Sequence, residues 1–278
     1  MSFLVSKQDG TSERFDSKKL LHSLEKAGAA HDVAESIVKA IEAEFSGRDN
    51  GVVSTHEIYS RAFSNLRAHK RPVAARYSLK KAVLDFGPSG FPFESYLAQL
   101  FMHDGYEAKT DQIVKGGCTE HEVDIVLTKD TDGKKETIFV EVKFHNSPVF
   151  KSDLKVALYV KARIDDLIAG GHTGARGMLV TNTKFTDRAI EYAECNLLEL
   201  LSWDYPQRHT LHERIEAAKL YPVTALTSLS RREKTALLEA KIVLCSQLIS
   251  NTEALASIGV AGHKAQVILE EAGALCSS

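Results

Sequence analysis

Apolar and polar positions alternate most clearly in two runs of the chain, residues 123–128 and 137–144. Both runs are rich in β-branched residues, and Asp132-Gly133 lies in the polar segment between them. Because Asp-Gly favours the tight turn of a hairpin, the pattern predicts two antiparallel strands. A two-residue turn places Asp124 opposite Glu141, whereas a longer loop would move this register by a residue or two.

The predicted hairpin brings together side chains that can do chemistry. Side chains alternate along a strand, so Glu141 and Lys143 share one face. One or two carboxylates, together with water and phosphate oxygens, are the usual ligands of Mg²⁺. A neighbouring Lys can orient an attacking water or offset charge on phosphorus. The alternative is an exposed amphipathic hairpin, on which Glu and Lys form a surface ion pair of little energetic value.

Helix and strand patterns surround the hairpin. Helical patterns cover residues 93–101, 153–169 and 185–193, and strand patterns follow Asp104-Gly105-Tyr106 and recur at 177–182 and 197–203. This order predicts a mixed α/β sheet with helices on both faces. The segment 86–92, which contains two Gly and two Pro residues, breaks regular structure and marks a domain boundary.

The spacing of Asp124, Glu141 and Lys143, within this order of elements, resembles the Mrr-like branch of the PD-(D/E)xK nucleases. The resemblance implies that residues 91–209 form a nuclease domain, in which Asp124 and Glu141 bind Mg²⁺ (or Mn²⁺) and Lys143 positions the attacking water. In many such nucleases a helical carboxylate completes the metal site, so Glu94 is a candidate third ligand. The alternative for Glu94 is a residue that only stabilises the start of its helix.

The first ninety residues predict a second hairpin followed by helices. Residues 3–7 and 13–15 flank Asp9-Gly10, and Asp16 or Ser17 is expected to cap the first helix. Further helical stripes follow, with a short strand at 52–53 and a last helix from Pro72 to Leu84.

The residues from Val5 to Leu20, VSKQDGTSERFDSKKL, resemble the ATP-cone, the nucleotide-binding regulatory module of ribonucleotide reductases and their regulators. The resemblance implies a nucleotide-binding domain over residues 1–87, with ATP or dATP as effector, since no Walker A loop is present. Gln8 stands where that family usually has Arg. The alternative for each Lys is a solvated surface charge. The residues implied to bind nucleotide are Val5, Lys7, Gln8, Glu13, Lys19, Thr55, Lys80 and Lys81.

Residues 210–278 carry apolar positions at helical spacing, and Gly259 and Gly262 precede the last helix. This region resembles the tandem helix-hairpin-helix module of recombinases and junction-processing proteins. The resemblance implies that the backbone at Gly259 and Gly262, aided by Lys264, contacts DNA phosphate. The alternative is a compact helical bundle used for dimerisation or packing.

Composition and charge restrict these hypotheses. The 278 residues suffice for two or three domains, and the formal charge of −2 excludes a general polyanion binder. Residues 91–209 hold 14 basic and 19 acidic residues, which suits a cation site but requires DNA contacts from local patches. No apolar run approaches the roughly 20 residues of a membrane span, and four dispersed Cys predict reduced thiols in a cytoplasmic protein without a membrane partner.

The sequence therefore predicts an α/β multidomain protein. We expect an N-terminal helical bundle with a small β-hairpin cap, a central mixed sheet of the restriction-endonuclease type and an all-α C-terminal region. The predicted function is a Mg²⁺-dependent endonuclease that cuts DNA, responds to ATP or dATP and forms a homodimer. The alternatives are a nucleotide-responsive DNA-binding or regulatory protein with an inactive nuclease fold, and a structure-specific junction resolvase.

Overall fold

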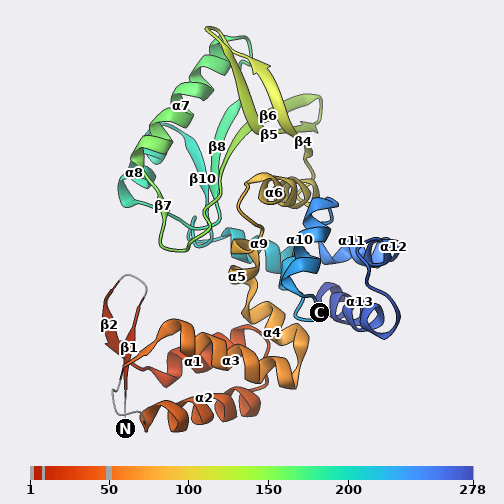
Figure 1. Ribbon diagram of the computed structural model, residues 1–278. Helices are drawn as coiled ribbons and strands as arrows, with labels where there is room; N and C mark the ends of the chain where they lie inside the picture. Colours follow the sequence, from red (N-terminus) through yellow and green to blue (C-terminus); the bar gives the residue numbers. More distant parts are fainter. Residues whose placement is uncertain (1–2, 8–9, 48–51, 278) are drawn as a thin grey trace.

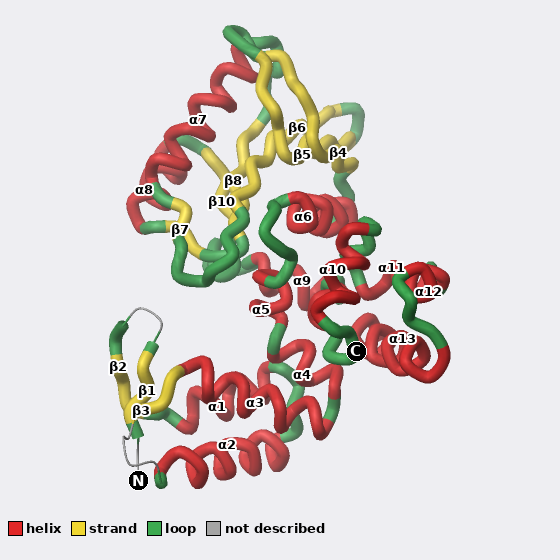
Figure 2. Tube along the Cα trace, in the orientation of Figure 1, coloured by secondary structure: helices red, strands yellow, loops and turns green. Residues whose placement is uncertain are grey.

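Three groups of elements make up the protein (Figures 1 and 2). The computed structural model describes residues 3–7, 10–47 and 52–277. In Figure 1 a small sheet with its helices lies at the bottom, a larger sheet lies at the top, and the C-terminal helices lie to the right. Helices α4, α5 and α6 run between these groups and contact the C-terminal helices.

The N-terminal group is a three-stranded sheet packed with five helices. Strand β1 (Leu4–Ser6) pairs antiparallel with β2 (Ser12–Arg14) and parallel with β3 (Val52–Ser54). The carboxylate of Asp16 accepts hydrogen bonds from the backbone N–H groups of Lys18 and Lys19, and so starts the first helix. The helices are α1 (Ser17–Lys26), α2 (His31–Ser46), α3 (Thr55–His69), α4 (Arg71–Tyr77) and α5 (Leu79–Leu84).

The prediction of one helix from Pro72 to Leu84 was wrong, because the segment forms the two helices α4 and α5. They meet at Ser78, whose φ of −93° and ψ of 9° depart from helical values. The Ser78 hydroxyl donates to the carbonyl oxygen of Ala75 at 3.1 Å. Ser side chains compete in this way with the backbone hydrogen bonds of a helix, which favours a break.

The central group is a mixed sheet, as the sequence predicted, and its five strands lie in the order β10-β8-β6-β5-β4. Helix α6 (Phe91–His103) lies on one face, and α7 (Leu154–Ala169) and α8 (Asp187–Cys195) lie on the other (Figure 1). The strands are β4 (Glu107–Lys115), β5 (Glu120–Thr131), β6 (Lys134–Lys143), β8 (Arg176–Thr181) and β10 (Leu198–Leu201). A separate pair is formed by β7 (Lys151–Ser152) and β9 (Lys184–Phe185).

The predicted hairpin and its register are confirmed. Thr131 pairs with Lys134 and Ile125 pairs with Val140, so the turn consists of Asp132 and Gly133. Both turn residues have positive φ, 54° and 78°, which a type I′ turn requires. This register directs Asp124 and Glu141 to the same end of the hairpin.

The C-terminal group is helical and shares one continuous apolar core with α5, α6 and one face of the large sheet, whereas the N-terminal strands and α1 to α3 enclose a separate core. The shared core runs from α5 and α6 through one face of the large sheet to the last helix. Buried polar contacts reinforce it: the Tyr96 hydroxyl donates to the Leu220 carbonyl and the Thr224 hydroxyl to the Ala82 carbonyl, each at 2.7 Å. The helices are α9 (Leu211–Ala218), a 3₁₀ turn (Val223–Ala225), α10 (Arg231–Glu239), α11 (Cys245–Ser250), α12 (Glu253–Ser257) and α13 (Gly262–Ser277). None of the helices described is both long and apolar enough to span a bilayer.

A buried carboxylate organises the C-terminal group. Glu271 of α13 is 4 % exposed and accepts hydrogen bonds from both the backbone N–H and the hydroxyl of Thr227 and of Ser228. The four distances lie between 2.5 and 2.9 Å. Because four donors point at one carboxylate, its removal leaves several of them buried without a partner.

We expect Glu271→Ala to lower the free energy of unfolding by about 3 kcal/mol, since unsatisfied buried donors are costly. Urea unfolding followed by circular dichroism measures this change. The control is Glu270→Ala, which removes an exposed carboxylate from the same helix and is expected to change stability by under about 0.5 kcal/mol. Equal effects of the two substitutions would contradict a role for the Glu271 hydrogen bonds.

Candidate functional sites

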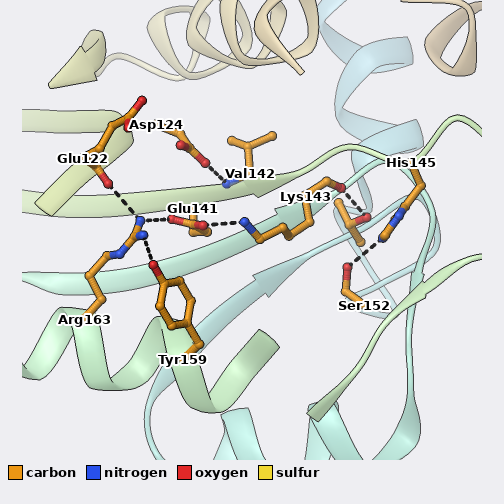
Figure 3. Close-up of polar contacts among 10 residues, drawn as sticks. Glu122, Asp124, Glu141, Val142, Lys143, His145, Ser152, Tyr159 and Arg163 are labelled. Carbon is orange, nitrogen blue, oxygen red and sulfur yellow. Dashed lines mark hydrogen bonds and ion pairs between the residues drawn. The ribbon is translucent and has the colours of Figure 1, made fainter. Parts of the chain in front are cut away.

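Strands β5 and β6 separate where the predicted chemistry lies. Their last paired residues are Ile125 and Val140; beyond this point β5 pairs with β4, and β6 pairs with β8. The backbone N–H of Val142 donates instead to Oδ2 of Asp124 at 2.6 Å (Figure 3). The Asp124 carboxylate therefore bridges the two strands at the end of their ladder.

Glu141 is the most enclosed carboxylate of the site, with 5 % exposure. Its Oε1 accepts from Nζ of Lys143 at 2.6 Å, and its Oε2 accepts from the guanidinium of Arg163 on α7 (Figure 3). The same guanidinium donates to the carbonyl oxygen of Glu122 at 2.8 Å and to the hydroxyl of Tyr159. Glu141 is thus fixed by a cation from its own strand and another from a helix.

The backbone that follows Glu141 is held by two residues, the last residue of β8 and the residue that follows β8. The Thr181 hydroxyl donates to the carbonyl oxygen of Lys143 at 2.8 Å. The Asn182 amide accepts from the N–H of His145 and donates to its carbonyl oxygen, each at 2.8 Å. Nε2 of His145 lies 3.2 Å from the Ser152 hydroxyl. Thr181 and Asn182 therefore support the end of β6.

Glu94 lies in the first turn of α6 and shares the electrostatic environment of Asp124. Burial, and then the negative charge of Asp124, raise the pKa of Glu94 to about 7. Burial, and then Glu141, also raise the pKa of Asp124, although the Val142 N–H partly opposes the rise. The site therefore holds more negative charge than its environment stabilises, and a bound cation would relieve this excess.

The predicted metal ligands do not form a ready-made set of three. Across residues 3–7, 10–47 and 52–277, no three His, Cys, Asp or Glu side chains lie close enough together to hold one metal ion. The reason is that Glu141 is held by Lys143 and Arg163, while Asp124 is held by Val142. Mg²⁺ needs only one or two carboxylate ligands besides water and phosphate oxygens. The carboxylates of this site provide oxygen ligands of that kind. The residues of the site therefore fit a hard divalent cation.

Sequence reasoning missed Arg163 and Tyr159. Their spacing of four residues places them on one face of a predicted helix, and the structure stacks the guanidinium on the Tyr159 ring at 4.8 Å. Nothing in the local sequence shows that this face turns toward Glu141, because that contact depends on how α7 packs on the sheet. His121, at the start of β5, lies 2.7 Å from Asp166 of α7, and this contact ties the start of the strand to that helix.

A cleft of about 710 Å³ lies in the N-terminal group. Gln8, one of the eight residues implied to bind nucleotide, lies outside the described residues. The other seven all line the cleft: Val5, Lys7, Glu13, Lys19, Thr55, Lys80 and Lys81. Asn146 and Pro148, from the loop after β6, also line it. The sequence motif thus corresponds to one cavity.

The lining of this cleft suits a nucleotide. Five basic side chains, Lys7, Arg14, Lys19, Lys80 and Lys81, face three carboxylates, Glu13, Asp16 and Asp85. Nζ of Lys7 donates to Glu13 at 2.8 Å, and this hydrogen bond, opposed by desolvation, lowers the pKa of Glu13. The stacked rings of Tyr59 and Tyr77, 5.3 Å apart, add an aromatic surface. Phosphate charge and a flat base both find matching groups here.

The C-terminal turn contains the predicted glycines but not a free Lys264. Gly259 and Gly262, with φ of 79° and 60°, flank the turn between α12 and α13. Nζ of Lys264 lies 2.5 Å from Oε1 of Glu233 on α10, and this contact is the main cause that lowers the pKa of Glu233 to about 2. Lys264 would have to leave this ion pair to bind a DNA phosphate.

Family comparisons assign the three parts of the chain. Residues 3–82 match the ATP cone domain, residues 88–205 match a restriction endonuclease domain, and residues 221–276 match the AF1548-like C-terminal region. The predicted ATP-cone and Mrr-like restriction-endonuclease domains are thereby confirmed. The helix-hairpin-helix interpretation of the C-terminal region stays a prediction.

Individual relatives agree with this division. An uncharacterised protein of Archaeoglobus fulgidus is 36 % identical over 177 residues, which are 63 % of this chain and 97 % of the relative. The transcriptional repressor NrdR of Crocosphaera subtropica is 37 % identical over 90 residues, 30 % of this chain and 48 % of the repressor. A crystal structure of AF1548, a protein of unknown function, is 34 % identical with a TM-score of 0.56 and covers 68 % of this chain and 98 % of its own.

We expect Glu94→Gln to stabilise the protein in metal-free buffer, and the gain to grow with pH. The pKa of Glu94 rises from 4.5 to about 7 on folding, so the folded state keeps a proton that the unfolded state has lost. The wild-type protein therefore loses stability between these pH values, and Gln removes that loss. Thermal unfolding in EDTA measures it. The exposed Glu120→Gln is the control, and a gain that is constant with pH would contradict the prediction.

Proposed function

The chain belongs to the AF1548-like family, and we propose that it is a metal-dependent endonuclease that hydrolyses DNA phosphodiester bonds under the control of ATP or dATP. The observation that carries the proposal is the meeting of Asp124, Glu141 and Lys143 where the β5–β6 ladder ends. Carboxylates beside an ammonium group, within a region that matches a restriction endonuclease domain, are suited to phosphoryl chemistry.

Each side chain of the site has a distinct task in this proposal. Asp124 and Glu141, with Glu94 as a third candidate, would hold Mg²⁺ or Mn²⁺, which supplies an activated water and offsets charge on the phosphate. The Lys143 ammonium, already 2.6 Å from Glu141, orients the attacking water and stabilises charge that develops on phosphorus. Arg163 acts through Glu141, whose carboxylate it holds in place, and is a positioning residue.

The remaining contacts with DNA and between subunits are also proposals. We infer that residues 1–87, 91–209 and 210–278 act as nucleotide-binding, nuclease and DNA-contacting domains. Gly259 and Gly262 would offer backbone N–H groups to a phosphate, and Lys264 would join them after release from Glu233. We also propose that the chain forms a homodimer, in which each copy would cut one strand of a DNA duplex.

A second candidate function is a nucleotide-responsive DNA-binding regulator that does not cut. It is favoured by the similarity of part of the chain to a transcriptional repressor. The engagement of both Glu141 oxygens by Lys143 and Arg163 also favours it, because a divalent cation would compete with these groups. This candidate retains the nucleotide cleft but assigns the carboxylates a structural role.

We expect Asp124→Asn and Lys143→Ala each to lower the cleavage rate by about a thousandfold or more. Where catalytic residues act as a unit, the removal of one costs nearly as much rate as the removal of all. Asn keeps an oxygen that can accept the Val142 N–H, so the fold at that position is preserved. Nicking and linearisation of supercoiled plasmid with Mg²⁺ or Mn²⁺, with and without ATP and dATP, measure the rate.

Lys134→Ala is the matched control for Lys143→Ala. Lys134 begins the same strand at the far end of the hairpin and is exposed. Its removal is expected to leave cleavage unchanged. A wild-type protein that binds nucleotide and DNA but cuts under none of these conditions would favour the regulator instead.

We expect Lys19→Ala to weaken ATP binding about tenfold at low salt, since a charged hydrogen bond to phosphate is worth roughly 1.5 kcal/mol or more. Isothermal titration calorimetry of the full chain measures the dissociation constant. The control is Lys18→Ala, because Lys18 is its exposed neighbour in α1 and does not line the cleft. Equal losses in both variants would indicate a general effect of charge rather than a site.

A further inference from the structure

We propose that the nuclease domain completes the nucleotide site: Asn146 and Pro148 bind the nucleotide together with the ATP-cone and transmit its presence to Lys143. The two residues line the same cleft as Lys7, Lys19 and Lys81, although they follow β6 in the chain. The inference rests on the proposed function, since it describes how that nuclease site is regulated.

Asn146 is suited to contact a nucleotide. It is exposed and lines the cleft, and its amide has no hydrogen-bond partner among the residues that the structure describes. An Asn amide can donate to a phosphate oxygen or ribose hydroxyl and can also pair with the edge of a base. Pro148 adds an apolar surface beside it. The site therefore offers a neutral amide opposite the lysines of the ATP-cone.

The loop that carries Asn146 is anchored at both ends, and its middle is held only by the Phe150 N–H to the Ser147 carbonyl at 3.4 Å and by the contact of the Phe150 and His145 rings, among the residues that the structure describes. The Asn182 amide brackets the backbone of His145, one residue before Asn146, and Ser152 pairs in β7 after the loop. Between these anchors, Val149 and Phe150 are 51 % and 63 % exposed. In Figure 1 this loop extends from the large sheet toward α5 and the N-terminal group. A nucleotide that binds the Asn146 amide would therefore displace the loop close to the anchored end of β6.

The anchored end of the loop leads directly to the nuclease site. Lys143 lies three residues before Asn146, and its carbonyl oxygen is held by Thr181. Phe144, between them, packs on Phe93 of α6 with ring centroids 5.6 Å apart. The next residue of α6 is Glu94. We infer that a shift of the loop large enough to strain the Asn182–His145 hydrogen bonds would move the Lys143 ammonium relative to the carboxylates of β6 and α6.

The thermodynamic requirement for such coupling is a difference in nucleotide contacts between two loop positions. In the position that brings Asn146 onto the nucleotide, binding gains a hydrogen bond; in the other position it does not. The nucleotide then favours the first position, and the geometry of Lys143 and Glu141 follows.

The test measures nucleotide binding and loop protection in the full-length chain, using ATP and dATP as probes. We expect Asn146→Ala to weaken binding about threefold to tenfold, which corresponds to one hydrogen bond. Asn146→Asp is expected to weaken binding further, because it faces the triphosphate with a like charge. Val149→Ala, in the same loop but outside the cleft, is expected to bind as the wild-type protein does.

Hydrogen exchange provides the second readout. We expect ATP to slow exchange in residues 144–150 of the wild-type protein, and Asn146→Asp to remove most of that slowing. Wild-type affinity in both Asn146 variants, with no nucleotide effect on this segment, would overturn the inference. Neither measurement uses cleavage, so a chain that binds ATP through Asn146 yet never cuts DNA would refute only the nuclease. A chain that binds neither nucleotide would overturn this inference and the proposed control by ATP or dATP, but not the proposed DNA cleavage.

Discussion

The buried carboxylate of Glu141 between two cations is the interaction on which the candidate nuclease site depends. A carboxylate with 5 % exposure is costly unless charge and hydrogen bonds compensate it, and Lys143 and Arg163 provide both. Because Arg163 belongs to α7, the same contact fixes that helix on the sheet. Because Lys143 belongs to β6, the contact also holds the ammonium on the strand that Asp124 joins through the Val142 N–H. The contacts of Glu141 with Lys143 and Arg163 therefore stabilise the fold and also position the side chains of the candidate site.

The parts of this site that local sequence determines could be predicted. The Asp132-Gly133 turn accepts two residues of positive φ, and that turn sets the register which brings Asp124 and Glu141 to one end of the hairpin. The residues implied to bind nucleotide were likewise suggested by a family resemblance, and the described ones line one cleft. Val5, Lys7, Glu13 and Lys19 come from one short stretch, whereas Thr55, Lys80 and Lys81 come from α3 and α5.

Most of the contacts that sequence reasoning missed join distant segments. Arg163 reaches Glu141 only because α7 packs across the sheet, and Asn146 reaches the ATP-cone only because the β6–β7 loop lies over it. Lys264 looked available for DNA, but Glu233 of another helix holds it. At Ser78 a hydroxyl that bonds to the backbone ended a helix whose apolar pattern continued. The first three contacts depend on tertiary packing, which periodicity does not report, whereas the contact of Ser78 with Ala75 is local.

The continuous core limits how a nucleotide can influence the nuclease site. Domains joined by a polar linker are expected to move as separate bodies, but here Phe86, in the short connection after α5, packs on Phe93 and Tyr96 of α6 at 6.1 and 5.1 Å. α5 carries Lys80 and Lys81 of the cleft, and α6 carries Glu94. A large rotation between cleft and sheet would expose this core. Regulation by small shifts at α6 and the β6–β7 loop is therefore the route that leaves the core intact.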